Sequence, residues 1–202
     1  MTRAVKRVVK LGGSLLDLEG LTSQLETWLA RQSPALDIVV VGGGAAAQRI
    51  RRLDEEHQLR DAAAHWLAVE AMSENSLTLA ERMPSAYLTV GPTDVDRQEA
   101  RSLLIFDPLN FLRDAEPTCA GEHLPQSWDV TSDSIAARLA EVVDADELVL
   151  LKSALPAART TYRQAADCGY VDRFFPRAAT GFTEVRCVNL RDSQLPEARL
   201  AR

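Results

Sequence analysis

The chain has 202 residues, of which 46% are hydrophobic and 26% are charged, and its formal net charge is −6. These values are ordinary for a globular protein and argue against a nucleic-acid-binding surface, which usually shows as a basic domain. No apolar run reaches the roughly 18 residues of a membrane span, and the three cysteines are widely spaced, as in proteins of a reducing compartment. We therefore expect a cytoplasmic protein without nucleic-acid or membrane partners.

Strands and helices are predicted to alternate along most of the chain. Runs of β-branched and apolar residues indicate strands, and apolar residues at helical spacing indicate helices. The continuous apolar run of residues 38–41 is typical of a strand buried on both faces of a parallel sheet. The predicted strands cover residues 4–11, 38–41, 86–90, 102–106, 147–152 and 185–190, and the main predicted helices cover residues 17–32, the segment after the second glycine cluster to residue 57, 61–82, 131–143 and 158–168.

This alternation predicts one α/β domain over residues 1–202, a three-layer αβα sandwich with a mostly parallel central sheet. Residues 116–128 are polar and are expected to form a loop, and the polar residues 191–202 are expected to form a loose tail. Ligands in such folds bind beyond the carboxyl ends of the strands. The chemistry is therefore expected just after residues 11, 41, 90 and 151.

The first strand ends in Gly12 and Gly13, followed by Ser14. Glycines let backbone N–H groups approach a phosphate closely, and a following helix N-terminus favours negative charge. Lys10 lies two residues before the first glycine, so its side chain would emerge beside this turn. The alternative is a plain strand–turn–helix corner in which the glycines serve tight geometry alone.

A second glycine cluster, Gly42, Gly43 and Gly44, follows the next buried strand. It matches neither the G-x-G-x-x-G pattern nor the P-loop pattern G-x-x-x-x-G-K-[ST]. Three successive glycines offer a donor-rich floor for an anion, and the alternative is close helix–strand packing. Two glycine-rich strand ends in one sheet could bind two anionic groups close to each other.

Two charged residues complete the candidate site. Asp133 lies at a predicted helix start, where it either compensates the helix dipole or holds phosphate-binding lysines in place. Lys152 ends a buried strand, and it either extends into solvent or binds a phosphate. The histidines and cysteines show no metal-ligand spacing, and the nucleophile elbow G-x-S-x-G is absent from the sequence.

The elements K-x-G-G-S, G-G-G and [ST]-x-D-S-x-A-A, in this order within residues 5–152, resemble the amino acid kinase family. The segments AHWLAVEAM, SWDVTSDSIAARLA and GYVDRFFP look most like a small branch that includes the [5-(aminomethyl)furan-3-yl]methyl phosphate kinase of methanofuran biosynthesis. The resemblance implies the amino acid kinase (carbamate kinase-like) fold. Residues 1–115 would bind the acceptor, and residues 116–190 would bind the nucleotide.

The resemblance also implies an activity. The γ-phosphate of ATP, with Mg²⁺, would pass to a small anionic metabolite, a phosphate monoester or carboxylate, in a homodimer or larger homo-oligomer. No metal would be held by the protein itself. The roles that the motifs imply are catalytic for Lys10, Asp133 and Lys152, nucleotide-binding for Gly12, Gly13, Ser14 and Lys152, and acceptor-binding for Gly42, Gly43 and Gly44.

The sequence departs from the family pattern in its last third. Ser153–Pro156 replaces the usual D-G-[IV]-[YF] turn, and no lysine follows Lys152. Either Lys152 or an arginine (Arg159, Arg173 or Arg177) takes the place of the late catalytic lysine, or transfer is impaired. The alternatives are therefore a nucleotide- or oxyanion-binding protein that keeps the fold without turnover, and an α/β scaffold without an anion site.

Overall fold

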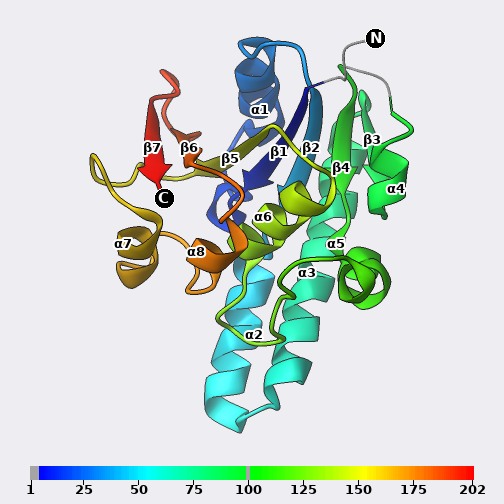
Figure 1. Ribbon diagram of the computed structural model, residues 1–202, viewed down its shortest axis with the longest axis vertical. Helices are drawn as coiled ribbons and strands as arrows, with labels where there is room; N and C mark the ends of the chain where they lie inside the picture. The colour runs from blue at the N-terminus through cyan, green and yellow to red at the C-terminus, as the bar shows by residue number, and fades with distance from the viewer. Residues whose placement is uncertain (1–4, 99–100) are drawn as a thin grey trace.

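A computed structural model describes residues 5–98 and 101–202, which form a seven-stranded sheet with helices on both faces (Figure 1). The strand order is β3-β4-β2-β1-β5-β6-β7, and all neighbours are parallel except β6 and β7. The predicted, mostly parallel sheet is thus confirmed. Its strands are β1 (Lys6–Leu11), β2 (Leu36–Val41), β3 (Ala86–Thr89), β4 (Leu103–Phe106), β5 (Glu147–Lys152), β6 (Glu184–Asn189) and β7 (Glu197–Ala201).

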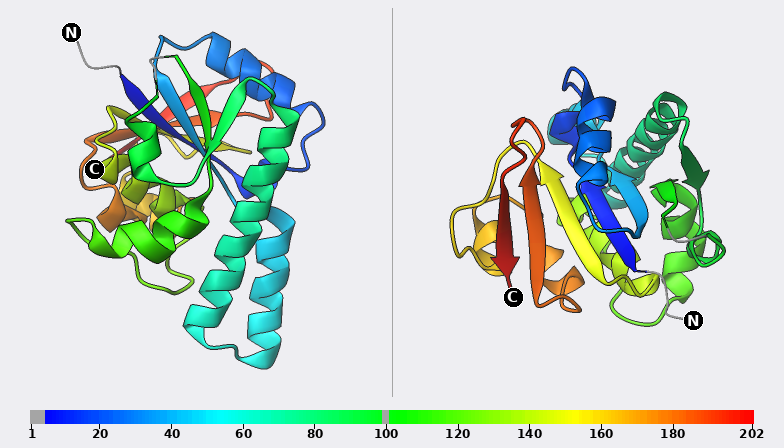
Figure 2. Two further views of the ribbon diagram at one scale, coloured as in Figure 1. Left: turned by 90° about the vertical axis from the view of Figure 1, so that its right-hand side faces the viewer. Right: turned by 90° about the horizontal axis from the view of Figure 1, so that it is seen from above.

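The two faces of the sheet carry separate hydrophobic clusters, because successive strand residues point to opposite faces. Val8 packs with the cluster beneath α6, and Val9 packs with the cluster beneath α1. The sandwich therefore has the three predicted layers (Figure 2). The helices are α1 (Leu21–Ala30), α2 (Gly44–His57), α3 (Asp61–Arg82), α4 (Pro92–Val95), α5 (Pro108–Asn110), α6 (Ser132–Val142), α7 (Tyr162–Asp167) and α8 (Phe175–Ala178).

Helices α2 and α3 form a hairpin that extends well beyond the sheet (Figures 1 and 2). The first helix of the pair, α2, has no buried residue, whereas α3 buries one face against the sheet and the loop after β4. Within the described part of the chain, no helix combines the length and the apolar character that crossing a membrane requires.

Two helices begin later than the sequence predicts. The helix expected over residues 17–32 begins at Leu21, because the first glycine pair leads into a short 3₁₀ turn, Gly13–Leu15. The helix expected over residues 158–168 begins at Tyr162, where Thr161 and Gln164 form a reciprocal capping box. The anion-favouring N-terminus of an α-helix therefore follows the second glycine cluster directly, but not the first.

The prediction of a loose tail over residues 191–202 is wrong. Residues Glu197–Ala201 form β7, which pairs antiparallel with β6 along five residues. The polar composition hides an alternation in which Leu200 points inward and is fully buried, while the residues on either side of it are exposed. The segment therefore forms the edge strand of the sheet beside β6.

Replacing Leu200 by Ala should lower the free energy of unfolding by about 2–5 kcal/mol, because a fully buried side chain is lost from the core. Urea denaturation monitored by circular dichroism would measure the change. Arg199→Ala on the same strand, where the side chain is 62% exposed, is the matched control and should change stability by less than about 0.5 kcal/mol. Equal stability of Leu200→Ala and the unmodified protein would contradict the structural role of β7.

Candidate active site

Strand register brings Lys10 and Lys152 to one face of the sheet. Lys10 lies opposite Leu150 in the parallel pairing of β1 and β5, so Lys152 is two residues further along the neighbouring strand. Because side chains alternate with a period of two, both lysines share the face that is covered by α6. Both lie at the carboxyl edge, where the sequence predicted the chemistry.

Asp133 lies in the first turn of α6 and contacts both lysines. Its Oδ1 is 2.9 Å from Lys10 Nζ, and its Oδ2 accepts a 2.8 Å hydrogen bond from Lys152 Nζ. The Lys10 and Asp133 side chains are each 6% exposed. Lys152 also donates to the Tyr170 carbonyl at 2.7 Å. The interpretation that Asp133 holds the lysines is thus supported by the contacts, in preference to a helix-dipole role alone.

Burial and charge act in opposite directions on the pKa values of this cluster. Burial is the largest influence on Lys10 and, opposed by Asp133 and aided by Lys152, lowers its pKa to about 8. Burial also disfavours the charged form of Asp133, but the two lysines together outweigh it and lower the pKa of Asp133 to about 2. The carboxylate is therefore ionised at neutral pH, and Lys10 loses its proton more readily than an exposed lysine does.

The two glycine clusters touch each other. A Cβ atom placed on Gly13 would lie 2.4 Å from the Gly44 nitrogen, and one placed on Gly42 would lie 2.7 Å from the Gly13 nitrogen. Gly44 also has a φ of +58°, a left-handed conformation that favours glycine. Close packing, the alternative interpretation, therefore explains Gly13, Gly42 and Gly44 in part. The same contact brings the backbone of both clusters to one point.

Gly12 and Ser14 lie between this contact and β5. The Gly12 N–H donates to the Leu151 carbonyl at 2.9 Å, and Ser14 is exposed, with its hydroxyl 3.3 Å from that of Ser153. Gly43 is the N-cap of α2, and a Cβ atom on it would lie 2.6 Å from Ala47 Cβ. The predicted glycines and Ser14 thus converge at the edge that carries Lys10.

Asp172 is a site residue that the sequence analysis missed. One of its oxygens accepts hydrogen bonds from the Thr131 N–H, the Thr131 hydroxyl and the Ser134 N–H at 2.9–3.0 Å. The other accepts from the Ser134 hydroxyl and, at 3.0 Å, from the Phe175 N–H. Asp172 therefore caps α6 from a distant loop. Burial raises its pKa, and nearby Asp133 adds to the rise.

Tyr170, two residues earlier, fixes the unusual turn after β5. Its hydroxyl donates to the Ala154 carbonyl at 3.1 Å, and its ring lies 5.0 Å from Lys152 Nζ. Segment 170–172 thus holds both Lys152 and the start of α6. The motif letters GYVDRFFP carried no indication of these two contacts.

Of the residues considered for the late lysine, Lys152 alone contacts Asp133. Arg173 lies 3.7 Å from Asp129 with its side chain 84% exposed, and Arg177 pairs with Glu122. Arg159 lies in an exposed turn at a φ of 60°. Among the candidates, the contacts therefore favour Lys152.

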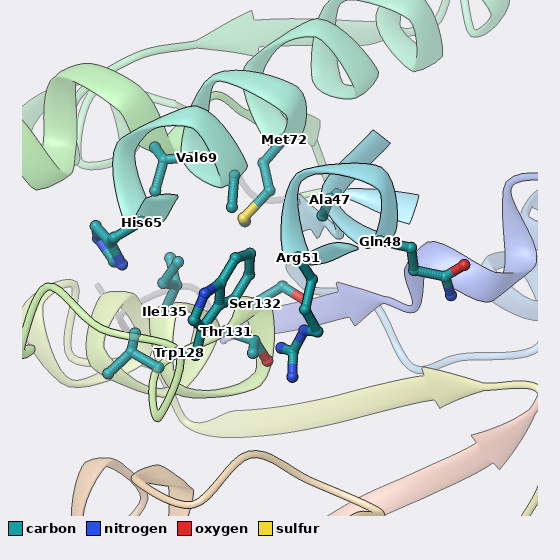
Figure 3. Close-up of a pocket in the computed structure, with 13 residues that line it drawn as sticks. Ala47, Gln48, Arg51, His65, Val69, Met72, Trp128, Thr131, Ser132 and Ile135 are labelled. Atoms are coloured by element: carbon teal, nitrogen blue, oxygen red, sulfur yellow. The ribbon is translucent and has the colours of Figure 1, made fainter. Parts of the chain in front are cut away.

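Two cavities meet at this cluster. A polar cavity of about 540 Å³ is lined by Asp133, Lys152 and Tyr170, among others. An apolar cavity of about 110 Å³ lies between α2, α3 and the start of α6 (Figure 3). Arg51 and Trp128 line both cavities. Lys152 and Asp133 therefore face a polar space that adjoins a smaller apolar one.

The comparisons with known proteins agree with this geometry. The model of the amino acid kinase family matches residues 6–154. The chain belongs to the amino acid kinase family. A similar protein is the [5-(aminomethyl)furan-3-yl]methyl phosphate kinase of Methanocaldococcus jannaschii, 27% identical over 147 residues. That alignment covers 71% of this chain and 63% of the relative, so the chain matches less than two thirds of that kinase.

Solved structures of uridylate kinases share the fold. The Ureaplasma parvum UMP kinase superposes with a TM-score of 0.68 at 13% identity, covering all of both chains. The Archaeoglobus fulgidus uridylate kinase gives 0.62 at 17% identity, covering 98% of this chain and 91% of that one. The Bacillus anthracis UMP kinase gives 0.63 at 16% identity, with coverages of 94% and 89%. The amino acid kinase fold predicted from the motifs is confirmed.

The two lysines of this amino acid kinase family member suit phosphate groups. Both oxygens of Asp133 are engaged by these lysines, Oδ1 by Lys10 and Oδ2 by Lys152. In residues 5–98 and 101–202, no three His, Cys, Asp or Glu side chains are grouped to hold a metal ion. A magnesium ion at this site would therefore be held chiefly by the phosphates of the nucleotide.

Asp172→Ala should lower the free energy of unfolding by about 2–4 kcal/mol, because α6 loses a cap and several buried donors lose their acceptor. It should also reduce ligand binding at Lys10, since Asp133 lies in the turn that Asp172 fixes. Urea unfolding and calorimetric titration with Mg-ATP would measure the two effects. Asp114→Ala is the control, since Asp114 is exposed and lines neither cavity, and an Asp172→Ala protein as stable as this control would refute the cap.

Proposed function

We propose that the protein is an ATP-dependent small-molecule kinase that transfers the γ-phosphate to a phosphate monoester or carboxylate. The observation that carries the proposal is the sharing of one carboxylate, Asp133, by two lysines at the sheet edge. Two cations and one anion leave positive charge unmatched beside the touching glycine clusters. That charge suits the phosphates of a donor and an acceptor.

Within residues 5–98 and 101–202, Asp133 is the one acid that forms an ion pair with either lysine. Asp172 is close enough to influence the pKa of Lys10, but its oxygens are occupied by donors from residues 131, 134 and 175. Asp129 lies near Arg173, and its side chain is 56% exposed. An incoming phosphate would thus restore the balance of charge around Lys10. In the low dielectric of a buried site such neutralisation is strong.

The roles follow from the positions of the groups. Lys10 would stabilise charge on the transferring phosphoryl group, and Lys152 would neutralise the phosphates of the donor. Asp133 would orient both ammonium groups and, with a pKa of about 2, would not act as a base. Backbone N–H groups near Gly12, Gly13 and Ser14 would contact the donor, and those of Gly42–Gly44 the acceptor. Catalysis of this kind consists of positioning and electrostatic stabilisation, and magnesium supplies further neutralisation of the phosphates.

The acceptor is proposed to be a phosphate monoester, as the name of the Methanocaldococcus jannaschii relative states for that kinase. A place in methanofuran-type one-carbon cofactor biosynthesis follows from the same likeness and is part of the proposal. Residues 1–115, together with the loop that leads into α6, would hold the acceptor, and the rest of residues 116–190 would hold the nucleotide. A homo-oligomer in the cytoplasm stays a prediction.

A nucleotide- or oxyanion-binding protein without turnover is the second candidate. The unusual turn Ser153–Pro156, fixed by Tyr170, and the absence of a lysine after Lys152 favour it. Binding without transfer would follow if Lys152, already engaged by Asp133 and Tyr170, could not move with the phosphoryl group.

Lys10→Met should lower kcat/KM about 10²–10³-fold, because one stabilising group at the developing charge is lost. The measurement is coupled ADP release with a panel of phosphate monoesters and carboxylates. Lys6→Met is the control, since Lys6 lies on the same strand but pairs with Asp96, away from Lys10. If Mg-ATP binds tightly and no acceptor ever yields ADP, the non-catalytic candidate replaces the kinase.

The rate should fall at alkaline pH. Burial lowers the pKa of Lys10 to about 8, so the free protein loses the required ammonium charge as the pH rises through this value. The alkaline limb of kcat/KM should therefore have an apparent pKa near 8. The limb of kcat should lie at higher pH, because bound phosphates favour the protonated form. Lys10→Arg should remove the limb near pH 8, and persistence of an unchanged limb would assign it to another group.

A further inference from the structure

The apolar cavity lies beside the second glycine cluster, outside the lysine–carboxylate site. Its volume is about 110 Å³, and Gly43, at the start of α2, lies in its wall. In Figure 3, Met72 from α3 faces the indole of Trp128, with Ile135 of α6 beside the ring. Thr131 and Ser132 line it where α6 begins, next to Asp133. A group bound here would therefore lie close to the phosphate-binding edge.

The lining favours an uncharged group. Aliphatic, thioether and aromatic side chains make up most of it, and it contains no Asp or Glu. His65 is buried, and burial lowers its pKa, so its imidazole is neutral at physiological pH. The one permanently charged residue of the lining, Arg51, stacks over the Trp128 ring with 4.4 Å between its Cζ atom and the ring centroid. An ammonium group inside this cavity would meet no carboxylate in the lining, and the only cation there for a carboxylate is Arg51, which stacks on Trp128.

The size of the cavity restricts the group further. A cavity of about 150 Å³ lined by aliphatic residues holds one benzene molecule, and drug-sized ligands occupy roughly 300–1,000 Å³. At about 110 Å³, this cavity suits one compact ring. A nucleobase together with its ribose is two rings and exceeds that space.

Trp128 lies at the boundary with the larger polar cavity, because it lines both cavities, as do Arg51 and Thr131. The indole is held from α2: its Nε1–H donates to Asp54 at 2.6 Å, and Arg51 covers its face. The loop that carries Trp128 is tied to α6 through Glu116, which pairs with the fully buried Arg138. The wall is therefore fixed by neighbours on two elements.

We infer that this cavity receives the ring of the acceptor and selects phosphate monoesters of a single compact ring over nucleoside monophosphates, with Trp128 as the specificity-determining wall. The inference rests on the proposed kinase function and deepens it. With the ring in the apolar cavity, the phosphate of the acceptor lies at the boundary with the polar cavity, beside the Gly42–Gly44 backbone and towards Lys10. The fit of the ring thus determines which phosphate monoester can place its phosphate near the lysines.

The test compares furan-3-ylmethyl phosphate, benzyl phosphate and UMP as acceptors, with ADP release and calorimetric binding measured in parallel. We expect kcat/KM for at least one ring phosphate to exceed that for UMP by more than about tenfold, the scale on which apolar pockets discriminate. UMP turnover equal to or better than both ring phosphates would overturn the inference while leaving the kinase intact. Ring phosphates that bind without ADP release, with UMP binding at least tenfold weaker, would refute the kinase and support the selectivity.

Trp128→Ala should open the apolar cavity into the polar one. The ratio of kcat/KM for UMP to kcat/KM for the ring phosphates should therefore rise by about tenfold or more. Phe182→Ala is the control, because Phe182 is also a partly buried aromatic residue and lines neither cavity. Its selectivity should equal that of the unmodified protein. Unchanged selectivity in Trp128→Ala, or an equal change in both variants, would remove Trp128 as the determinant. Failure of all three acceptors to bind the unmodified protein would overturn the inference itself.

Discussion

One buried carboxylate shared by two lysines organises the functional edge of this protein. Asp133 lies 2.8–2.9 Å from the ammonium groups of Lys10 and Lys152, which come from adjacent parallel strands. Breaking one side of such a buried pair leaves an uncompensated charge, which is strongly destabilising. The position of α6 over the sheet, and with it the walls of both cavities, is therefore coupled to this contact.

The rest of the edge keeps that contact in place. Asp172 caps α6 from outside, so the turn that carries Asp133 depends on a loop some 40 residues later. On the other side, Gly13 and Gly44 approach so closely that a side chain on either would collide with its neighbours. Packing and anion binding are thus not competing explanations of the glycines, since close packing is what places two sets of backbone donors together.

The sequence predicted the parts of the site that lie on regular elements. Lys10, Asp133 and Lys152 could be found because strand ends and a helix start have a defined place in a parallel sheet. Tyr170, Asp172 and Trp128 were missed because they act from loops, where no periodicity relates sequence to position. The prediction for residues 191–202 was wrong for a different reason. Strand β7 has five residues, and Leu200 is its single large apolar residue, so the alternation is too short to be recognised in a polar segment.

The lowered pKa of Lys10 links stability to function. Burial disfavours the charged form of Lys10, so without a ligand the folded protein bears a desolvation cost for this ammonium group. Any anion that pairs with it binds the folded chain in preference to the unfolded one and stabilises the fold by mass action. Lys152, by contrast, is already satisfied by Asp133 and the Tyr170 carbonyl. The two lysines are therefore unequal: Lys10 gains most from an incoming phosphate, and Lys152 serves as the fixed charge against which that phosphate is placed.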